Sequence, residues 1–119
     1  MATYSRQLLS GSTNGRVIPV VATATPGTTI HTAVSGTTSF DEIYLWVVNV
    51  TGAAATLTLE FGGVLDPGDH ACKALVIPAN SQPIQVLSGQ VLQNSLLLRA
   101  FSDAASATNL YGYVNRITP

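Results

Sequence analysis

His31, Ser35 and Asp41 are three side chains whose types match a catalytic triad. Together they supply the nucleophile, the base and the orienting acid of Ser/His/Asp hydrolysis. No nucleophile-elbow motif accompanies them. We therefore favour a partly buried, hydrogen-bonded His31 within a strand, and we expect no catalytic residues and no enzymatic activity.

Asp66, Asp69 and His70 form a second group, whose oxygen and nitrogen atoms are of the kind that metals bind. The spacing fits neither a calcium loop nor a zinc site. The run Asp-Pro-Gly-Asp is a turn sequence, in which proline sets φ and glycine supplies a positive φ. The segment therefore predicts a turn, with no metal and no other cofactor.

Cys72 is the single cysteine, so the chain contains no internal disulfide. Only Lys73 lies near enough in sequence to activate its thiol, which favours a small packed apolar group.

Asn49-Val50-Thr51 matches a glycosylation sequon. We interpret that match as chance, because the N-terminus lacks the apolar core of a signal peptide.

The elements that must position these residues are short strands. No segment has a sustained 3.6-residue apolar period, and turn-forming residues recur at short intervals. We predict an N-terminal arm at 1–15 and a single all-β domain at 16–119. That domain is expected to be a β-sandwich or jelly roll of about eight short antiparallel strands. The predicted strands are 16–23, 28–34, 42–50, 55–61, 72–77, 82–87, 95–101 and 109–117.

The faces of three predicted strands differ. The segment 55–61 alternates apolar and polar residues, which predicts one face in water. The segments 42–50 and 109–117 lack a strongly polar face. Such strands are central in a sheet, or another subunit covers their second face. The side chains that we assign to an interface with another subunit or another protein on these two strands are Tyr44, Trp46, Val48, Tyr111 and Tyr113.

The composition is poor in charge. Lys and Arg number 5 and Asp and Glu number 6, which makes 9% charged residues and a net charge of −1. Ordinary soluble domains have roughly 25%. So few charges predict poor solubility for a free monomer and use within an assembly. The low basic content argues against nucleic acid as a partner, and the absence of a long apolar stretch argues against a membrane span.

The predicted arm carries two adjacent leucines, Leu8 and Leu9, beside a Gly/Ser tract. We expect both leucines to be exposed and to dock on a neighbouring copy or another protein. The arm has no alternating pattern, so the core of the domain is not expected to need it.

Five stretches spread over nearly the whole chain share a common likeness. They are LLSGSTNGR (8–16), ATPGTTIHTA (24–33), DEIYLWVVN (41–49), LTLEFGG (57–63) and YGYVNR (111–116). They resemble small virion proteins of tailed bacteriophages. In size, strand content and low charge the chain is also similar to head-decoration, or cement, proteins.

This resemblance implies a decoration protein, which would form a homo-oligomer and, by analogy, a trimer. It would bridge major capsid subunits on the capsid exterior after synthesis in the host cytoplasm. A neck or tail structural component is an alternative that the same composition fits. A glycan-binding module that uses the Tyr/Trp surface is a second alternative.

Overall fold

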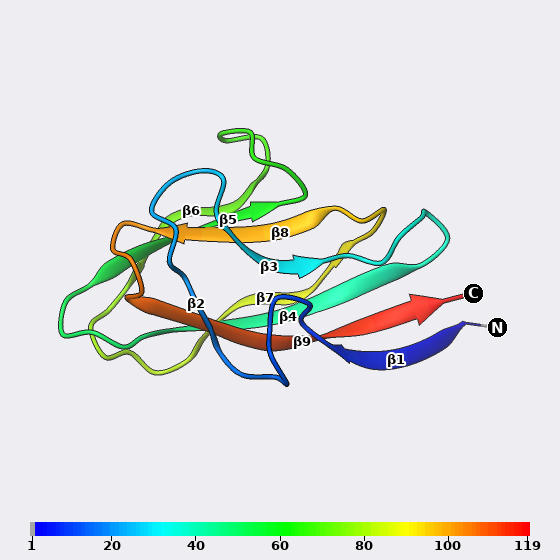
Figure 1. Ribbon diagram of the computed structural model, residues 1–119, viewed down its shortest axis with the longest axis horizontal. Coiled ribbons are helices and arrows are strands. Elements are labelled where there is room, and N and C mark those ends of the chain that lie inside the picture. The colour runs from blue at the N-terminus through cyan, green and yellow to red at the C-terminus, as the bar shows by residue number, and fades with distance from the viewer. Residues whose placement is uncertain (1) are drawn as a thin grey trace.

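The computed structural model describes residues 2–119, and in this part of the chain all regular structure is β-strand. Two antiparallel sheets face each other as a β-sandwich (Figure 1). The predicted fold class is confirmed. The strands are β1 (Thr3–Leu8), β2 (Ile18–Pro19), β3 (Thr28–Thr32), β4 (Phe40–Asn49), β5 (Ala55–Phe61), β6 (His70–Ile77), β7 (Ile84–Leu92), β8 (Leu97–Ser102) and β9 (Thr108–Thr118).

The first sheet has the order β1-β9-β4-β7, and β2 also pairs with β9. β1 and β2 lie one after the other along the same edge of β9. β1 ends with Leu8 opposite Tyr113, and β2 begins with Ile18 opposite Leu110. Between them the chain leaves the sheet, so this edge has a gap. The second sheet has the order β3-β8-β5-β6.

The core lies between the two sheets and is apolar. β4 shows how the sequence builds it, because its ten residues alternate between half-buried and buried positions. Ile43, Leu45 and Val47 point inward and are fully buried. Their β-branched and aliphatic side chains suit a pleated surface with one face against a core. The same alternation sends Tyr44 and Trp46 to the outside.

Two predicted boundaries differ from the structure. The strand predicted at 16–23 is reduced to β2. The Val20 amide still donates to Thr108 of β9, and the chain then crosses to the second sheet, where the Ala22 carbonyl accepts from the Ser102 amide of β8. The strand predicted at 82–87 is longer than expected, because β7 continues through Ser88 and Gly89 to Leu92. There Gly89 has a φ of 92° and the register with β4 shifts, so the glycine forms a bulge rather than ending the strand.

The arm predicted at 1–15 is in large part a strand of the sandwich. Met1 lies outside the described residues. β1 pairs with β9 over all six of its residues, and Leu9 is 1% exposed within the core. The expectation of an arm that the core does not need is therefore wrong. β1 is an edge strand that is exposed almost throughout, so it lacks the apolar alternation by which sequence reveals a strand.

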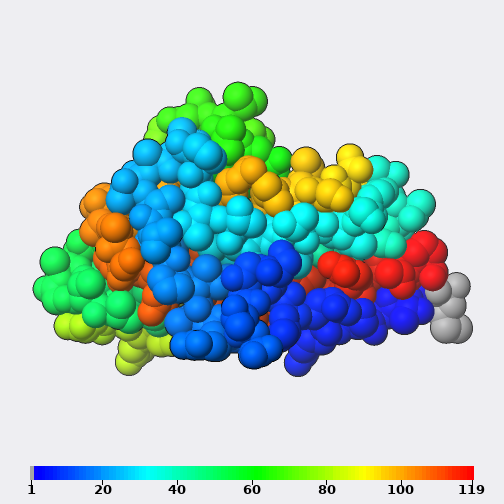
Figure 2. All heavy atoms as spheres, in the orientation of Figure 1, coloured from blue at the N-terminus to red at the C-terminus, as the bar shows by residue number. Residues whose placement is uncertain are grey.

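The water-facing side predicted for 55–61 is also wrong. Thr58 and Glu60 are both buried. The segment between β2 and β3, which lies on the surface of the molecule in Figure 2, contacts Glu60, whereas Thr58 accepts a hydrogen bond from the Ala74 amide of β6. The Thr25 hydroxyl donates to one Glu60 carboxylate oxygen at 2.6 Å, and the Gly27 amide donates to the other at 2.7 Å. These two charge-assisted hydrogen bonds supply polar partners that water would otherwise supply.

Candidate functional site

The outer face of the five-stranded sheet gathers the aromatic residues that the sequence singled out. Strand register places their side chains in two neighbouring rows. The first row contains Leu8, Tyr113, Tyr44 and Ser88, and the second contains Tyr111, Trp46 and Gln85. We call the surface formed by Tyr44, Trp46, Tyr111 and Tyr113 the aromatic face. All four side chains are half-buried.

The rings stand upright on the sheet and stack on one another. The centroids of Tyr44 and Tyr113 are 4.9 Å apart with 17° between the ring planes. The Arg6 guanidinium lies 4.4 Å from the centroid of Tyr113. Because β9 lies between β1 and β4, Arg6 and Tyr44 cover opposite sides of the Tyr113 ring. The aromatic face therefore presents largely ring edges and hydroxyl groups to a partner.

A groove of about 340 Å³ runs beside the second row. Trp46 and Tyr111 stack in it with centroids 6.3 Å apart. The groove reaches the position where the sheet edge is interrupted between β1 and β2. The pairing of β9 with β4 at this position requires glycine at 112, because a Cβ there would collide with the Tyr44 carbonyl oxygen of β4. The lining residues are Gly15, Trp46, Pro83, Tyr111, Gly112 and Tyr113.

The remaining predicted interface residues lie in different places. Val48 lies opposite Asn109 on the outer side of β4 and is half-buried. Leu8 is 55% exposed at the end of the first row, beside the aromatic face. Leu9 is in the core, so the prediction that both leucines are exposed holds for Leu8 and is wrong for Leu9. Successive residues of an extended chain point to opposite sides, which separates the two.

Arg6, Gly15 and Pro83 belong to this surface but were not among the sequence candidates. Arg6 reaches Tyr113 only through the register of β1 with β9, and Gly15 and Pro83 reach the groove from separate loops. The positive φ of Gly15, 84°, follows the turn signal of Asn14-Gly15. That signal indicates a turn but not what the turn lies against.

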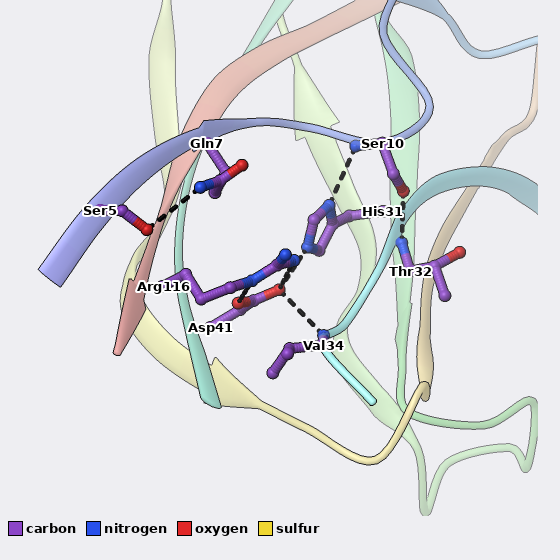
Figure 3. A network of polar contacts seen from close by, with 8 residues as sticks. All are labelled: Ser5, Gln7, Ser10, His31, Thr32, Val34, Asp41 and Arg116. Carbon is purple, nitrogen blue, oxygen red and sulfur yellow. Dashed lines mark hydrogen bonds and ion pairs between the residues drawn. The ribbon is translucent and has the colours of Figure 1, made fainter. Parts of the chain in front are cut away.

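His31 and Asp41 form a buried polar network together with Arg116 (Figure 3). The Arg116 guanidinium donates to both Asp41 oxygens, at 2.8 and 3.0 Å. His31 Nε2 lies 2.8 Å from Asp41 Oδ2, and the Val34 amide donates to the same oxygen. The Ser10 amide donates to His31 Nδ1 at 3.0 Å. The network ties the segment after β1 to β3, β4 and β9.

This arrangement lacks the requirements of a hydrolytic triad. Because an amide N–H donates to Nδ1, the lone pair of His31 is occupied and its proton is on Nε2, facing Asp41. Ser35 is exposed and makes none of these contacts. Burial raises the pKa of Asp41, but hydrogen bonds from Arg116 and His31 outweigh it and hold that pKa below its ordinary value. The carboxylate is thus a fixed anion that positions its neighbours.

The loop before β6 behaves as the predicted turn. Asp66 accepts a hydrogen bond from Lys73 Nζ at 2.7 Å, which lowers the pKa of Asp66. The Asp69 carboxylate accepts from the Leu65 amide at 3.0 Å. Asp69 is therefore engaged within the loop, and Asp66 is engaged by Lys73 of β6. Among residues 2–119, no group of three His, Cys, Asp or Glu side chains is arranged to hold a metal ion.

Cys72 is partly buried and Asn49 is fully buried. Burial raises the pKa of the Cys72 thiol, which packs against the core, so it stays protonated near neutral pH. The Asn49 amide donates to the carbonyl oxygens of Ala53 at 2.8 Å and Ile77 at 3.1 Å. Its side chain is buried, which removes the sequon from access.

Comparisons with known proteins give no relative for this chain: no family model, no curated protein and no solved structure matches it. In the part of the chain that the structure describes, no helix is long and apolar enough to cross a membrane.

Proposed function

We propose that the protein is a structural component of a tailed-phage virion, and more specifically a head-decoration protein. It joins copies of itself into a symmetric oligomer and bridges major capsid subunits on the capsid exterior. The observation that carries the proposal is the aromatic face, which a single polypeptide leaves partly open. The likeness of the five sequence stretches to phage virion proteins supplies the biological setting.

The distribution of charge supports an assembly. Of the eleven charged side chains, Asp41 and Glu60 are buried, so nine remain for a surface of 6049 Å². On the outer rows around the aromatic face, Arg6 and Glu42 are the charged positions. Tyr and Trp are enriched at interfaces and charged residues are depleted at interface centres. A face of this kind is suited to contact with protein.

Symmetry and repetition supply the mechanism. Identical subunits usually close by rotation, and the family likeness implies three-fold closure. Each contact with the capsid can then be modest, because an oligomer that binds several capsid subunits at once gains affinity through effective concentration. No step of this mechanism requires catalysis.

A glycan-binding module is the second candidate, and the geometry of the aromatic rings restricts where a sugar could bind. Stacking on a sugar requires an exposed ring face. Arg6 and Tyr44 cover both sides of Tyr113, so this ring has no side left for a sugar. The groove beside Trp46 and Tyr111 remains as the place where a pyranose would bind.

The oligomer is tested with Trp46→Asp, using Val76→Asp as a matched control. Val76 is 62% exposed on β6, in the other sheet. Light scattering at micromolar concentration should give a closed oligomer for the wild type and for Val76→Asp. Trp46→Asp should remain folded by circular dichroism but lose the oligomer. A monomeric wild type, or an unchanged Trp46→Asp oligomer, would contradict the proposal.

The position in the particle is tested by reconstructing purified virions that contain the chain. Many copies on the head surface would support decoration. A single ring at the neck or tail would instead support the structural alternative. Weak binding of oligosaccharides that disappears in Trp46→Ala, with a monomeric protein, would favour the glycan module.

A further inference from the structure

β1 is an open edge of the five-stranded sheet. It pairs with β9 on one side only, and all of its residues except the half-buried Gln7 are exposed. Such an edge leaves alternate backbone N–H and C=O groups unpaired. An unpaired regular edge is a template for another strand, and natural proteins usually block it.

The other long edges of the sandwich are irregular, but β1 is not. The register of β3 shifts between Thr29 and His31, and that of β7 shifts at Gly89. β6 has register shifts, a positive φ at Ala74 and an exposed Lys73. Bulges and lysines are devices that discourage edge pairing. β1 keeps an unbroken register with β9 for its full length. It has no bulge and no lysine, and its charged side chain is Arg6.

We propose that β1 pairs with the β1 strand of a second copy of this chain, antiparallel across a two-fold axis at Ser5. An antiparallel pair of identical strands is self-complementary, which is the requirement of a two-fold contact. With Ser5 opposite itself, Arg6 of one copy lies opposite Tyr4 of the other. Thr3 and Gln7, which point to the inner side as Ser5 does, also lie opposite each other.

Charge selects this register over its neighbour. If the strands shift by one residue each, Arg6 lies opposite Arg6, and like charges directly opposite are destabilising. In the proposed register Arg6 lies between Tyr113 of its own chain and Tyr4 of the second copy. Tyr4 is 69% exposed in the single chain. The contact therefore covers an exposed ring and extends the Tyr44–Tyr113–Arg6 stack.

This inference rests on the sheet edge and does not depend on the role proposed above. The aromatic face lies on the outer face of the five-stranded sheet, whereas the β1 contact is made through the edge of that sheet. The edge contact can therefore link two closed oligomers or exist in a protein that never meets a capsid.

Cysteine cross-linking tests the contact and its register in the full chain. Tyr4→Cys and Arg6→Cys are made in a Cys72→Ala background and are oxidised mildly, alone and as a mixture. The mixture should give a disulfide-linked dimer, because positions 4 and 6 lie opposite each other. Neither variant should cross-link alone, and Val76→Cys, on the other sheet, serves as the control. Cross-linking of Arg6→Cys alone, or none in the mixture, would overturn the proposal.

Sedimentation of charge variants gives an independent measurement. Tyr4→Arg places an arginine opposite Arg6 and should weaken the edge contact about tenfold, or about 1.4 kcal/mol. Tyr4→Glu places a carboxylate there and should not weaken it. Both substitutions lie at an exposed position, and circular dichroism checks that the fold is kept. Equal dissociation constants for the two variants would refute a contact between Arg6 and position 4.

Discussion

β4 and β5 are interior strands of the two sheets, and their outer faces have opposite fates. β4 carries mainly apolar side chains on both sides, yet its outer face remains partly open and carries Tyr44 and Trp46. β5 alternates apolar and polar residues as a strand with one solvent-exposed face does, yet Glu60 on its outer face is fully buried. The alternation of residue types along a strand shows which side chains are polar. It does not predict their exposure to solvent, because a segment distant in sequence can cover them.

The two strands also hold their buried carboxylates differently. Asp41 on β4 faces a cation, Arg116, and an imidazole, whereas Glu60 on β5 accepts from a hydroxyl and an amide. Both carboxylates tie the N-terminal third of the chain to the sandwich. The first fixes the segment around Ser10, and the second fixes the segment at Thr25 and Gly27.

The largest effect should come from Asp41→Asn, which breaks the ionic network at the beginning of β4. It leaves Arg116 without its counter-ion and should lower the free energy of unfolding by about 4 kcal/mol. Denaturant unfolding measures this change. A smaller loss of unfolding free energy for Asp41→Asn than for Glu60→Ala would contradict the expectation that the ion pair on β4 contributes more than the neutral hydrogen bonds on β5.

Acid should reveal the same network. The pKa of Asp41 is held below its ordinary value of 3.8 in the fold. Its contribution to stability is therefore present above that value and is lost as the pH falls through the lower, folded pKa. Wild-type stability should fall in this acidic range more steeply than that of Asp41→Asn. Parallel pH profiles would contradict the assignment.

Leu8 and Leu9 are adjacent in sequence, but the side chain of Leu8 is exposed and that of Leu9 is buried. Leu9→Ala removes a core side chain and should cost about 3.5 kcal/mol. Leu8→Ala, at an exposed position, should change stability by less than about 0.5 kcal/mol. Thermal unfolding of the two variants compares them directly, and equal effects would mean that Leu9 is not a core residue.

Glu60→Ala should destabilise the covered face of β5 by about 2.5 kcal/mol, because the half-buried Gly27 amide and the Thr25 hydroxyl lose their acceptor. Glu60→Gln keeps one acceptor oxygen and should cost less. Hydrogen exchange at Gly27 should become faster in the alanine variant. Unchanged exchange there would show that Glu60 does not hold the covering segment.

Arg6→Ala should have the smallest effect, about 0.5 kcal/mol, because its contact with Tyr113 on the open face is exposed to solvent. Tyr113 fluorescence quenching by a soluble quencher should increase, since one side of the ring is uncovered. A loss as large as that of Glu60→Ala would mean that the open face contributes to folding as the covered one does.

The sequence by itself determined the all-β class, most strands and the side chains of the aromatic face. Turn residues act over a few positions and strand alternation over two, so both are visible in a local stretch of chain. It also correctly favoured a turn at Asp66–Asp69 and a hydrogen-bonded His31.

Only the tertiary structure decided that β1 is an edge strand, that Leu9 is in the core and that Glu60 is covered. Each depends on residues far apart in sequence: β1 meets β9 near the other end of the chain, and Gly27 meets Glu60. An edge strand needs no apolar alternation, because its pairing uses backbone groups that every residue carries. A buried glutamate needs no special neighbours in sequence, because the chain brings its donors from another loop.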